Sequence, residues 1–206
     1  NPQPMVLAGN RPGDNLYTDS VVAIDARTGK LRWHFQETPH DSLDYDSAPE
    51  PVLIDVKHGG TVEKLVVHAN KSGFTYVLDR ATGKLIGAWP HADRITWTKG
   101  IDKDGRPIDP LQNEPGVEKL VCPSVYGSRA ANHSAYSPRT GWWYNTSFEV
   151  CAKMRAAPLM PFKEGDFVIG GFLSPERSRT TKPFIAAFDP LTGKRQWTHE
   201  TEVLNA

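Results

Sequence analysis

The feature that most constrains the fold is a phrase that recurs four times along the chain. Each copy is an apolar run, then a turn of the form Asp-x-x-Thr-Gly-Lys or a variant of it, then a second run that often carries Trp. The copies occupy residues 22–33, 76–85, 135–142 and 185–197. Asp opens such a turn by accepting backbone N–H groups, and Gly takes the position with φ > 0, so each copy predicts a β-hairpin.

The spacing of the four copies predicts the architecture. Their turn glycines are Gly29, Gly83, Gly141 and Gly193, separated by 54, 58 and 52 residues. A hairpin cannot bury its apolar face alone, so repeated hairpins indicate sheets stacked side by side. A period of about 55 residues fits a β-propeller with elaborated blades better than a solenoid of short repeats. We therefore expect an all-β fold of about four blades.

Composition excludes some functions. Lys plus Arg and Asp plus Glu both count 24, so the formal net charge is zero. This balance gives no support for a nucleic-acid partner or an anionic membrane surface. No apolar run approaches the length of about 18 residues that a membrane-spanning helix needs, so we expect no membrane span.

The ends of the chain do not resemble those of a complete protein. Residue 1 is Asn, followed at once by Pro, and the chain stops just after a strand-like segment. We expect a single propeller domain over residues 1–206 that is incomplete at both ends. A missing targeting signal then carries no information about the compartment.

A carboxylate-rich stretch at residues 38–46 is the first candidate for a functional site. If the chain is extended there, Asp44 and Asp46 point to one face and Tyr45 to the other. Two neighbouring carboxylates repel each other unless a proton or a cation lies between them. A hard cation with oxygen ligands would resolve this repulsion. The alternative is a polar loop whose Asp residues cap turns.

Three further residues have two interpretations from sequence alone. Lys71 lies in an Asn-Lys-Ser-Gly turn, where an ordinary surface lysine is expected. Cys122 and Cys151 each flank a strand-like apolar run. They are either buried free thiols or a bridge between neighbouring strands, and a bridge would indicate an oxidising compartment.

Longer phrases then identify a family. They include Arg-Pro-Gly-Asp-Asn-Leu-Tyr at 11–17, Thr-Pro-His-Asp-Ser-Leu-Asp at 38–44, Asn-Lys-Ser-Gly-Phe-Thr-Tyr-Val-Leu-Asp-Arg at 70–80 and Ala-Tyr-Ser-Pro at 135–138. In order and spacing, the sequence resembles the pyrroloquinoline quinone (PQQ)-dependent alcohol dehydrogenases over almost its whole length. These are periplasmic quinoproteins. The resemblance implies an eight-bladed β-propeller with W-shaped antiparallel blades.

The resemblance assigns roles to four residues. Asn1 falls on a metal-ligating Asn of the family. Asp44 falls on the catalytic Asp, which also reaches the metal. Lys71 falls on the basic residue that contacts the quinone oxygens. Asp46 matches an extra carboxylate of lanthanide-using members, where members that use Ca²⁺ carry a small neutral residue.

The remaining matches are less uniform. Asn132 lies near the place where relatives have an Asn that touches the cofactor, but a turn Asn is the alternative because the surrounding residues depart from the family pattern. Cys122 and Cys151 match a pair that is bridged in many members. Leu43 departs from the family, because many relatives carry Trp immediately before the catalytic Asp.

These matches imply oxidation of a primary alcohol to an aldehyde by PQQ and a metal ion, with Asp44 as the base and a cytochrome c as electron acceptor. A lanthanide is expected rather than Ca²⁺, and the compartment is expected to be the periplasm. A homodimer is left open. One alternative is a non-catalytic propeller that serves as a binding or assembly module. The other is a PQQ-dependent sugar or polyol dehydrogenase.

Overall fold

The computed structural model describes residues 3–6, 11–46, 48–158, 160–176 and 183–202. These residues form an all-β structure without a helix. Its strands are β1 (Ser20–Ile24), β2 (Leu31–Gln36), β3 (Val52–His58), β4 (Thr61–Ala69), β5 (Phe74–Asp79), β6 (Leu85–Pro90), β7 (Glu118–Val121), β8 (Ala135–Ser137), β9 (Trp142–Ser147), β10 (Cys151–Ala156), β11 (Gly171–Glu176), β12 (Phe184–Phe188) and β13 (Arg195–Glu200). Within this part of the chain there is accordingly no helix long and apolar enough to cross a membrane.

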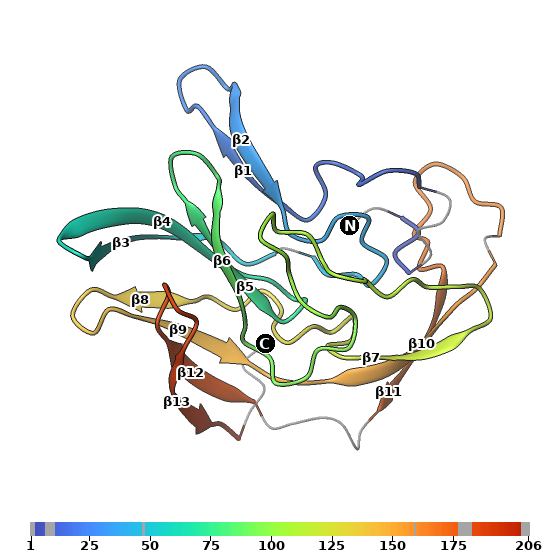
Figure 1. The fold of residues 1–206 in the computed structure, drawn as a ribbon. Coiled ribbons are helices and arrows are strands. Elements are labelled where there is room, and N and C mark those ends of the chain that lie inside the picture. Colours follow the sequence, from blue (N-terminus) through green and yellow to red (C-terminus); the bar gives the residue numbers. More distant parts are fainter. Residues whose placement is uncertain (1–2, 7–10, 47, 159, 177–182, 203–206) are drawn as a thin grey trace.

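The strands form four antiparallel sheets in the described part of the chain. Two have four strands, in the orders β3-β4-β5-β6 and β13-β12-β9-β8. Strands β1 and β2 pair with each other, and β11-β10-β7 form a three-stranded sheet. Figure 1 shows the β1–β2 hairpin, the sheet of β3 to β6 and the sheet of β8, β9, β12 and β13 arranged one after another. This arrangement agrees with the expected all-β fold of stacked sheets.

The four predicted hairpins are confirmed, and their turns share one hydrogen-bond pattern. The turn glycines have φ between 69° and 73°. In the first turn, Gly29 N–H donates to the carbonyl of Asp25 at 2.8 Å, and the Asp25 carboxylate accepts from the N–H of Thr28 at 3.0 Å. The third copy has Ser137 in place of Asp, yet Gly141 N–H still donates to its carbonyl at 2.9 Å. The conformation of the turn is therefore determined by hydrogen bonds between residues of the turn itself.

The four hairpins do not each belong to a separate sheet. The third (β8–β9) and the fourth (β12–β13) lie in one sheet, because β9 pairs with β12 along its length, from Phe184 opposite Ser147 to Phe188 opposite Trp143. The period of the sequence repeat therefore reflects the spacing of hairpins along the chain and not the spacing of sheets. Two hairpins can complete one four-stranded sheet when their inner strands satisfy each other's backbone groups.

Tryptophan side chains join consecutive sheets. Trp33 of β2 packs on the β5–β6 turn, where its Nε1–H donates to the carbonyl of Arg80 at 3.3 Å. A Cβ on Gly83 would lie 2.5 Å from the Trp33 ring. Trp89 of β6 packs in the same way on the turn of Gly193 and donates to the carbonyl of Pro190. These turns therefore require glycine for two reasons: its positive φ, and the space that the indole of the neighbouring sheet occupies.

The central sheet is buried on both faces. Leu65 and Val67 of β4 face a core that includes Trp143 and Phe184 of the next sheet. Val66, between them, faces the β1–β2 hairpin. Neighbouring residues of a strand point to opposite faces of the sheet. Burial of both faces therefore explains why Leu65, Val66 and Val67 are all apolar.

A third core joins the loop after β2 to the three-stranded sheet. It contains Leu43 and Tyr45 of the loop, Phe74 of β5 and Met154 of β10. Trp97, in the segment between β6 and β7, also belongs to it. Close by, Cys122, which follows β7, forms a disulfide with Cys151, the first residue of β10. The two strands are antiparallel neighbours, so the bridge ties adjacent ends together.

The tryptophan contacts predict that Gly83→Ala is more costly than the same change in an isolated turn. The added Cβ would meet Trp33 and also occupy a left-handed conformation, for a combined loss of about 2–4 kcal/mol in the free energy of unfolding. Urea unfolding of the full-length protein measures this loss.

Gly141→Ala is the matched control. Its φ of 71° is nearly the same, and no heavy atom of the described residues lies within 4 Å of the added Cβ. It should cost only about 1 kcal/mol. Equal losses at the two positions would show that the packing of Trp33 does not depend on Gly83.

Candidate functional site

The carboxylate-rich stretch is a folded loop between β2 and β3, organised by one buried side chain. Asp41 accepts the N–H of Leu43 at 2.9 Å on one carboxylate oxygen and that of Tyr45 at 3.0 Å on the other. These bonds turn the chain, and Asp44 takes a φ of 61°. The segment is therefore not extended, and the alternation of faces that an extended chain would give does not apply, because Asp41 replaces strand pairing with local bonds. A positive φ is uncommon outside glycine, and Asp is among the residues that tolerate it.

Despite this turn, Asp44 and Asp46 reach the same cation. The Nζ of Lys71 lies 3.2 Å from Oδ2 of Asp44 and 3.0 Å from Oδ2 of Asp46. The Lys71 side chain is only 12% exposed, and those of Asp44 and Asp46 are 17% and 39% exposed. The two carboxylates thus converge on one positive charge at the edge of solvent. The repulsion expected between these two carboxylates is offset here by the ammonium of Lys71.

Lys71 is held in the tight turn between β4 and β5. The Asn70 side chain accepts the N–H of Ser72 at 2.7 Å, which shapes the turn. The carbonyl of Lys71 accepts the N–H of Ser128 at 3.0 Å, and the Lys71 stem packs against Gly127. This packing leaves no room for a Cβ at Gly127. Lys71 is therefore a fixed, mostly buried residue, which excludes the alternative of a mobile surface lysine.

Tyr45 anchors the loop between the two carboxylates. Its side chain is fully buried, and its hydroxyl donates to the carbonyl of Pro123 at 2.6 Å. Its ring packs edge-on against Trp97, with centroids 5.3 Å apart. Trp97 in turn donates to the carbonyl of Ser72, at 2.9 Å, in the Lys71 turn. One aromatic contact thus connects both halves of the site.

A second layer of carboxyl groups lies behind the site. Burial raises the pKa of Asp19 to about 8, and the charges of Asp41 and Asp46 add to this rise. Burial also raises the pKa of Asp41 to about 6, against the lowering effect of its two backbone hydrogen bonds. Asp19 therefore carries its proton near neutral pH, which limits the negative charge gathered around Asp46.

The other expected site residues have different outcomes. Asn1 lies outside the described residues. The Asn132 side chain accepts the N–H of Ala130 at 3.3 Å and so closes its own loop, as in the alternative of a turn Asn. The Asn132 carbonyl accepts from the buried guanidinium of Arg129.

Sequence reasoning missed three buried polar residues beneath Lys71. They are Glu37, directly after β2, His68 on β4 and Asn70 in the following turn. The available signal was that His68 interrupts the apolar run that begins at Leu65, with Asn70 two residues later. The sequence did not indicate that Glu37 lies against both, because it is 31 residues away from His68.

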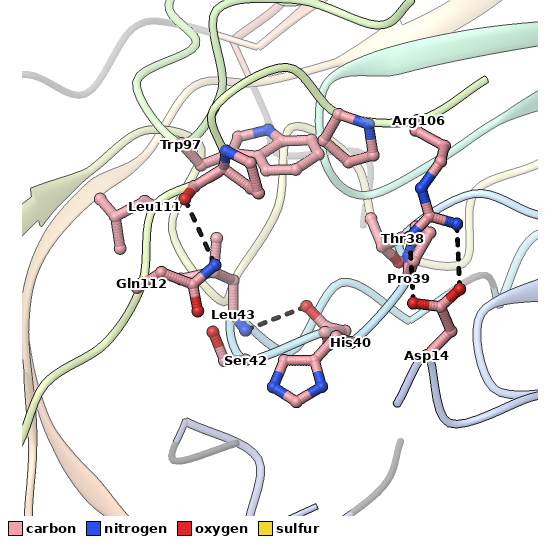
Figure 2. A pocket seen from close by; sticks show the side chains of 13 residues that line it. Asp14, Thr38, Pro39, His40, Ser42, Leu43, Trp97, Arg106, Leu111 and Gln112 are labelled. Atoms are coloured by element: carbon pink, nitrogen blue, oxygen red, sulfur yellow. Dashed lines mark hydrogen bonds and ion pairs between the residues drawn. The ribbon is translucent and has the colours of Figure 1, made fainter. Parts of the chain in front are cut away.

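A separate cavity of about 250 Å³ lies beside the loop. Figure 2 shows Trp97 on one side of it and the ion pair of Arg106 with Asp14 on another. Leu43 also lines it. Asp44, Asp46 and Lys71, all described by the structure, do not line it. The converging charges and this cavity are therefore distinct features of the same loop.

Comparison with known proteins decides the family. Residues 1–104, half of the chain, match the family model described as "Glucose/ethanol/alcohol dehydrogenase, beta-propeller domain" of the PQQ enzymes. The chain belongs to the PQQ-dependent alcohol dehydrogenase family. The matched region contains Asp44, Asp46 and Lys71.

Individual relatives agree with this assignment. The chain is 36% identical over 198 residues to the quinoprotein alcohol dehydrogenase PedH of Pseudomonas putida, covering 92% of this chain and 33% of PedH. It is 33% identical over 204 residues to a lanthanide-dependent methanol dehydrogenase of Methylacidiphilum fumariolicum, covering 96% of this chain and 33% of that protein. The chain thus spans about a third of the length of the curated relatives it matches.

Solved structures confirm the fold. A europium-containing methanol dehydrogenase superposes with a TM-score of 0.84 at 32% identity, over 92% of this chain and 34% of that one. The quinohemoprotein alcohol dehydrogenase of Comamonas testosteroni gives a TM-score of 0.79 at 32% identity, over 91% and 30%. The expected all-β propeller fold is confirmed.

The residues present fit a metal and quinone site of this family in part. Two carboxylate oxygens that converge on one positive charge are a suitable donor pair for a hard cation, and the Lys71 ammonium stands in that position. Across the described ranges, no group of three or more His, Cys, Asp and Glu side chains could hold a metal ion. Asp44 and Asp46 would therefore supply part of a ligand set.

The protonated state of Asp19 predicts a pH-dependent stability. An Asp in the unfolded chain loses its proton near about pH 4, whereas Asp19 in the folded chain keeps it up to about pH 8. The unfolded state binds fewer protons between these values, so stability falls as pH rises through that window. Asp19→Asn should remove this loss and gain about 4 kcal/mol over wild type between pH 5 and pH 8.

Urea unfolding of the metal-free, full-length protein at both pH values measures this gain. Asp55→Asn, at a largely exposed carboxylate on β3, is the control and should follow the wild type. A pH profile of Asp19→Asn that parallels the wild type would contradict a buried, protonated Asp19.

Proposed function

We propose that this chain supplies one side of the active site of a PQQ- and metal-dependent enzyme that oxidises a primary alcohol to an aldehyde. The observation that carries the proposal is the convergence of Asp44 and Asp46 on Lys71. A purely structural propeller has no use for two carboxylates and an amine held together and partly buried. The non-catalytic binding or assembly module is for this reason the weaker alternative.

The residues divide the chemistry between them. PQQ, when bound, would supply the acceptor for the hydride of the alcohol carbon, which carries both electrons of the oxidation. Asp44 takes the proton of the alcohol hydroxyl on its carboxylate and so acts as the general base. Lys71 donates a hydrogen bond to a quinone oxygen and offsets negative charge there. Asn132 is a further proposed contact to the cofactor.

The proposed metal ligands are Asn1, Asp44 and Asp46. A hard cation prefers such oxygen donors, and the second carboxylate favours a trivalent lanthanide over Ca²⁺ by Coulomb attraction. Two relatives support this choice, since they are named as lanthanide-dependent and europium-containing methanol dehydrogenases. Asn1 enters through the family resemblance alone.

The wider setting is also a proposal. We place the chain in a single eight-bladed propeller domain that extends beyond residues 1–206, in a periplasmic enzyme that passes electrons to a cytochrome c. The Cys122–Cys151 disulfide supports an oxidising compartment. One relative is named as a 1-butanol dehydrogenase (cytochrome c). A sugar or polyol substrate remains the second candidate, because the family model also covers glucose dehydrogenases.

The test is reconstitution of the full-length apo-protein with PQQ and either La³⁺ or Ca²⁺, followed by dye-linked oxidation of ethanol and of glucose. We expect ethanol oxidation with La³⁺ and little with Ca²⁺. Asp46→Ala should lower the La³⁺-dependent rate by about tenfold or more, since it removes a metal ligand.

Asp55→Ala, at the exposed carboxylate on β3, is the control and should keep the full rate. Activity with Ca²⁺ alone would retain the enzyme and reject the lanthanide. Oxidation of glucose without ethanol would favour the second candidate. Absence of both PQQ binding and activity would favour a binding or assembly module.

A further inference from the structure

A buried ion pair lies directly beneath the candidate site. Glu37 is fully buried, and its Oε1 lies 2.6 Å from Nδ1 of His68, which is 2% exposed. The other ring nitrogen of His68 lies 2.7 Å from the carbonyl oxygen of Pro49. Both nitrogens thus lie at hydrogen-bond distance from oxygen atoms, the arrangement in which an imidazolium donates from each nitrogen. Burial lowers the pKa of His68, but the charge and hydrogen bond of Glu37 outweigh it and raise that pKa.

The second oxygen of Glu37 holds Asn70. The Asn70 amide donates to Oε2 of Glu37 at 2.9 Å and also lies 3.4 Å from the carbonyl oxygen of Tyr45. Tyr45 stands between Asp44 and Asp46 in the chain, and Asn70 immediately precedes Lys71. The Asn70 side chain therefore contacts the backbone of the carboxylate loop at Tyr45 and the backbone of the Lys71 turn at Ser72.

Glu37 itself is fixed to the sheets. Its N–H donates to the carbonyl of Asp19 at 2.9 Å, and its carbonyl accepts the hydroxyl of Tyr76, on β5, at 3.0 Å. Because its backbone N–H and carbonyl are both hydrogen-bonded, Glu37 holds its carboxylate in a fixed position for the groups that bind it.

We infer that Glu37 is a positioning residue that sets the separation between the carboxylate loop and Lys71. It contacts neither the proposed metal nor the substrate, and acts through Asn70. The inference rests on the proposed function, because it assigns Glu37 a role in that same site.

The chemistry of the two donors explains why a carboxylate is needed. His68 and Asn70 each direct an N–H at a different oxygen of Glu37. In Glu37→Gln one of these oxygens becomes an NH₂ group, which cannot accept a hydrogen bond. If that NH₂ group faces Asn70, Asn70 loses its acceptor; if it faces His68, Nδ1 of His68 gives up its proton and the stronger, charge-assisted hydrogen bond is lost. In either case the contacts that hold Asn70 and the carboxylate loop in place are weakened.

Two measurements on the full-length protein test this role without turnover. The first is the affinity for Tb³⁺, followed by its luminescence in the PQQ-free protein. The second is the rate at which an amine-reactive ester labels Lys71, read by peptide mass spectrometry in the metal-free protein. We expect Glu37→Gln to weaken Tb³⁺ binding by about tenfold or more and to speed the labelling of Lys71.

Glu63→Gln is the matched control. Glu63 also pairs with a histidine, at 3.3 Å from Nδ1 of His58, but this pair is exposed on the β3–β4 hairpin. It should change neither measurement. If Glu37→Gln does not fold, Asn70→Ala removes the link to Tyr45 while leaving the Glu37–His68 pair in place, and the same two changes are expected.

A double-variant cycle separates positioning from a general loss of stability. Adding Glu37→Gln to Asp46→Asn should weaken Tb³⁺ binding less than adding it to wild type, because both act on one site. Equal effects in the two backgrounds, or unchanged labelling of Lys71, would overturn the inference. A wild type that binds no Tb³⁺ would count against the proposed metal alone, since Lys71 labelling reports positioning without it.

Discussion

The structure depends on each sheet having its apolar face covered by the next. No hairpin of this chain can bury its own face, and the contacts that solve this are repeated: an indole of one sheet packs on the glycine turn of the following one, as with Trp33 on Gly83 and Trp89 on Gly193. The same stacking buries the central sheet on both sides.

The candidate site is a consequence of that stacking. The carboxylate loop follows the β1–β2 hairpin, whereas Lys71 belongs to the central sheet. They meet because Tyr45 and Trp97 fill the space between the hairpins and the three-stranded sheet. Rigid elements thus hold short polar side chains at fixed distances, which is the arrangement that binding and catalysis need.

Charge around the site is arranged in layers. At the edge of solvent, two carboxylates share one ammonium group. Behind them, Asp19 keeps its proton near neutral pH, and Glu37 is neutralised by His68. The deeper acids therefore add little net repulsion, so the exposed pair remains the place where a further cation is attracted. Membership in the PQQ-dependent alcohol dehydrogenase family gives this charge pattern a chemical context.

The sequence by itself determined the features that depend on local bonds. The Asp-x-x-Thr-Gly turns could be predicted because their hydrogen bonds join residues at most five apart, and the pattern of Asp44, Asp46 and Lys71 marked the candidate site. Only the tertiary structure decided that β9 pairs with β12. It also decided that Glu37, His68 and Asn70 meet in the interior. The physical reason is that these contacts depend on how distant segments pack, and a local pattern or period does not encode which distant partner a strand or a buried polar group will find.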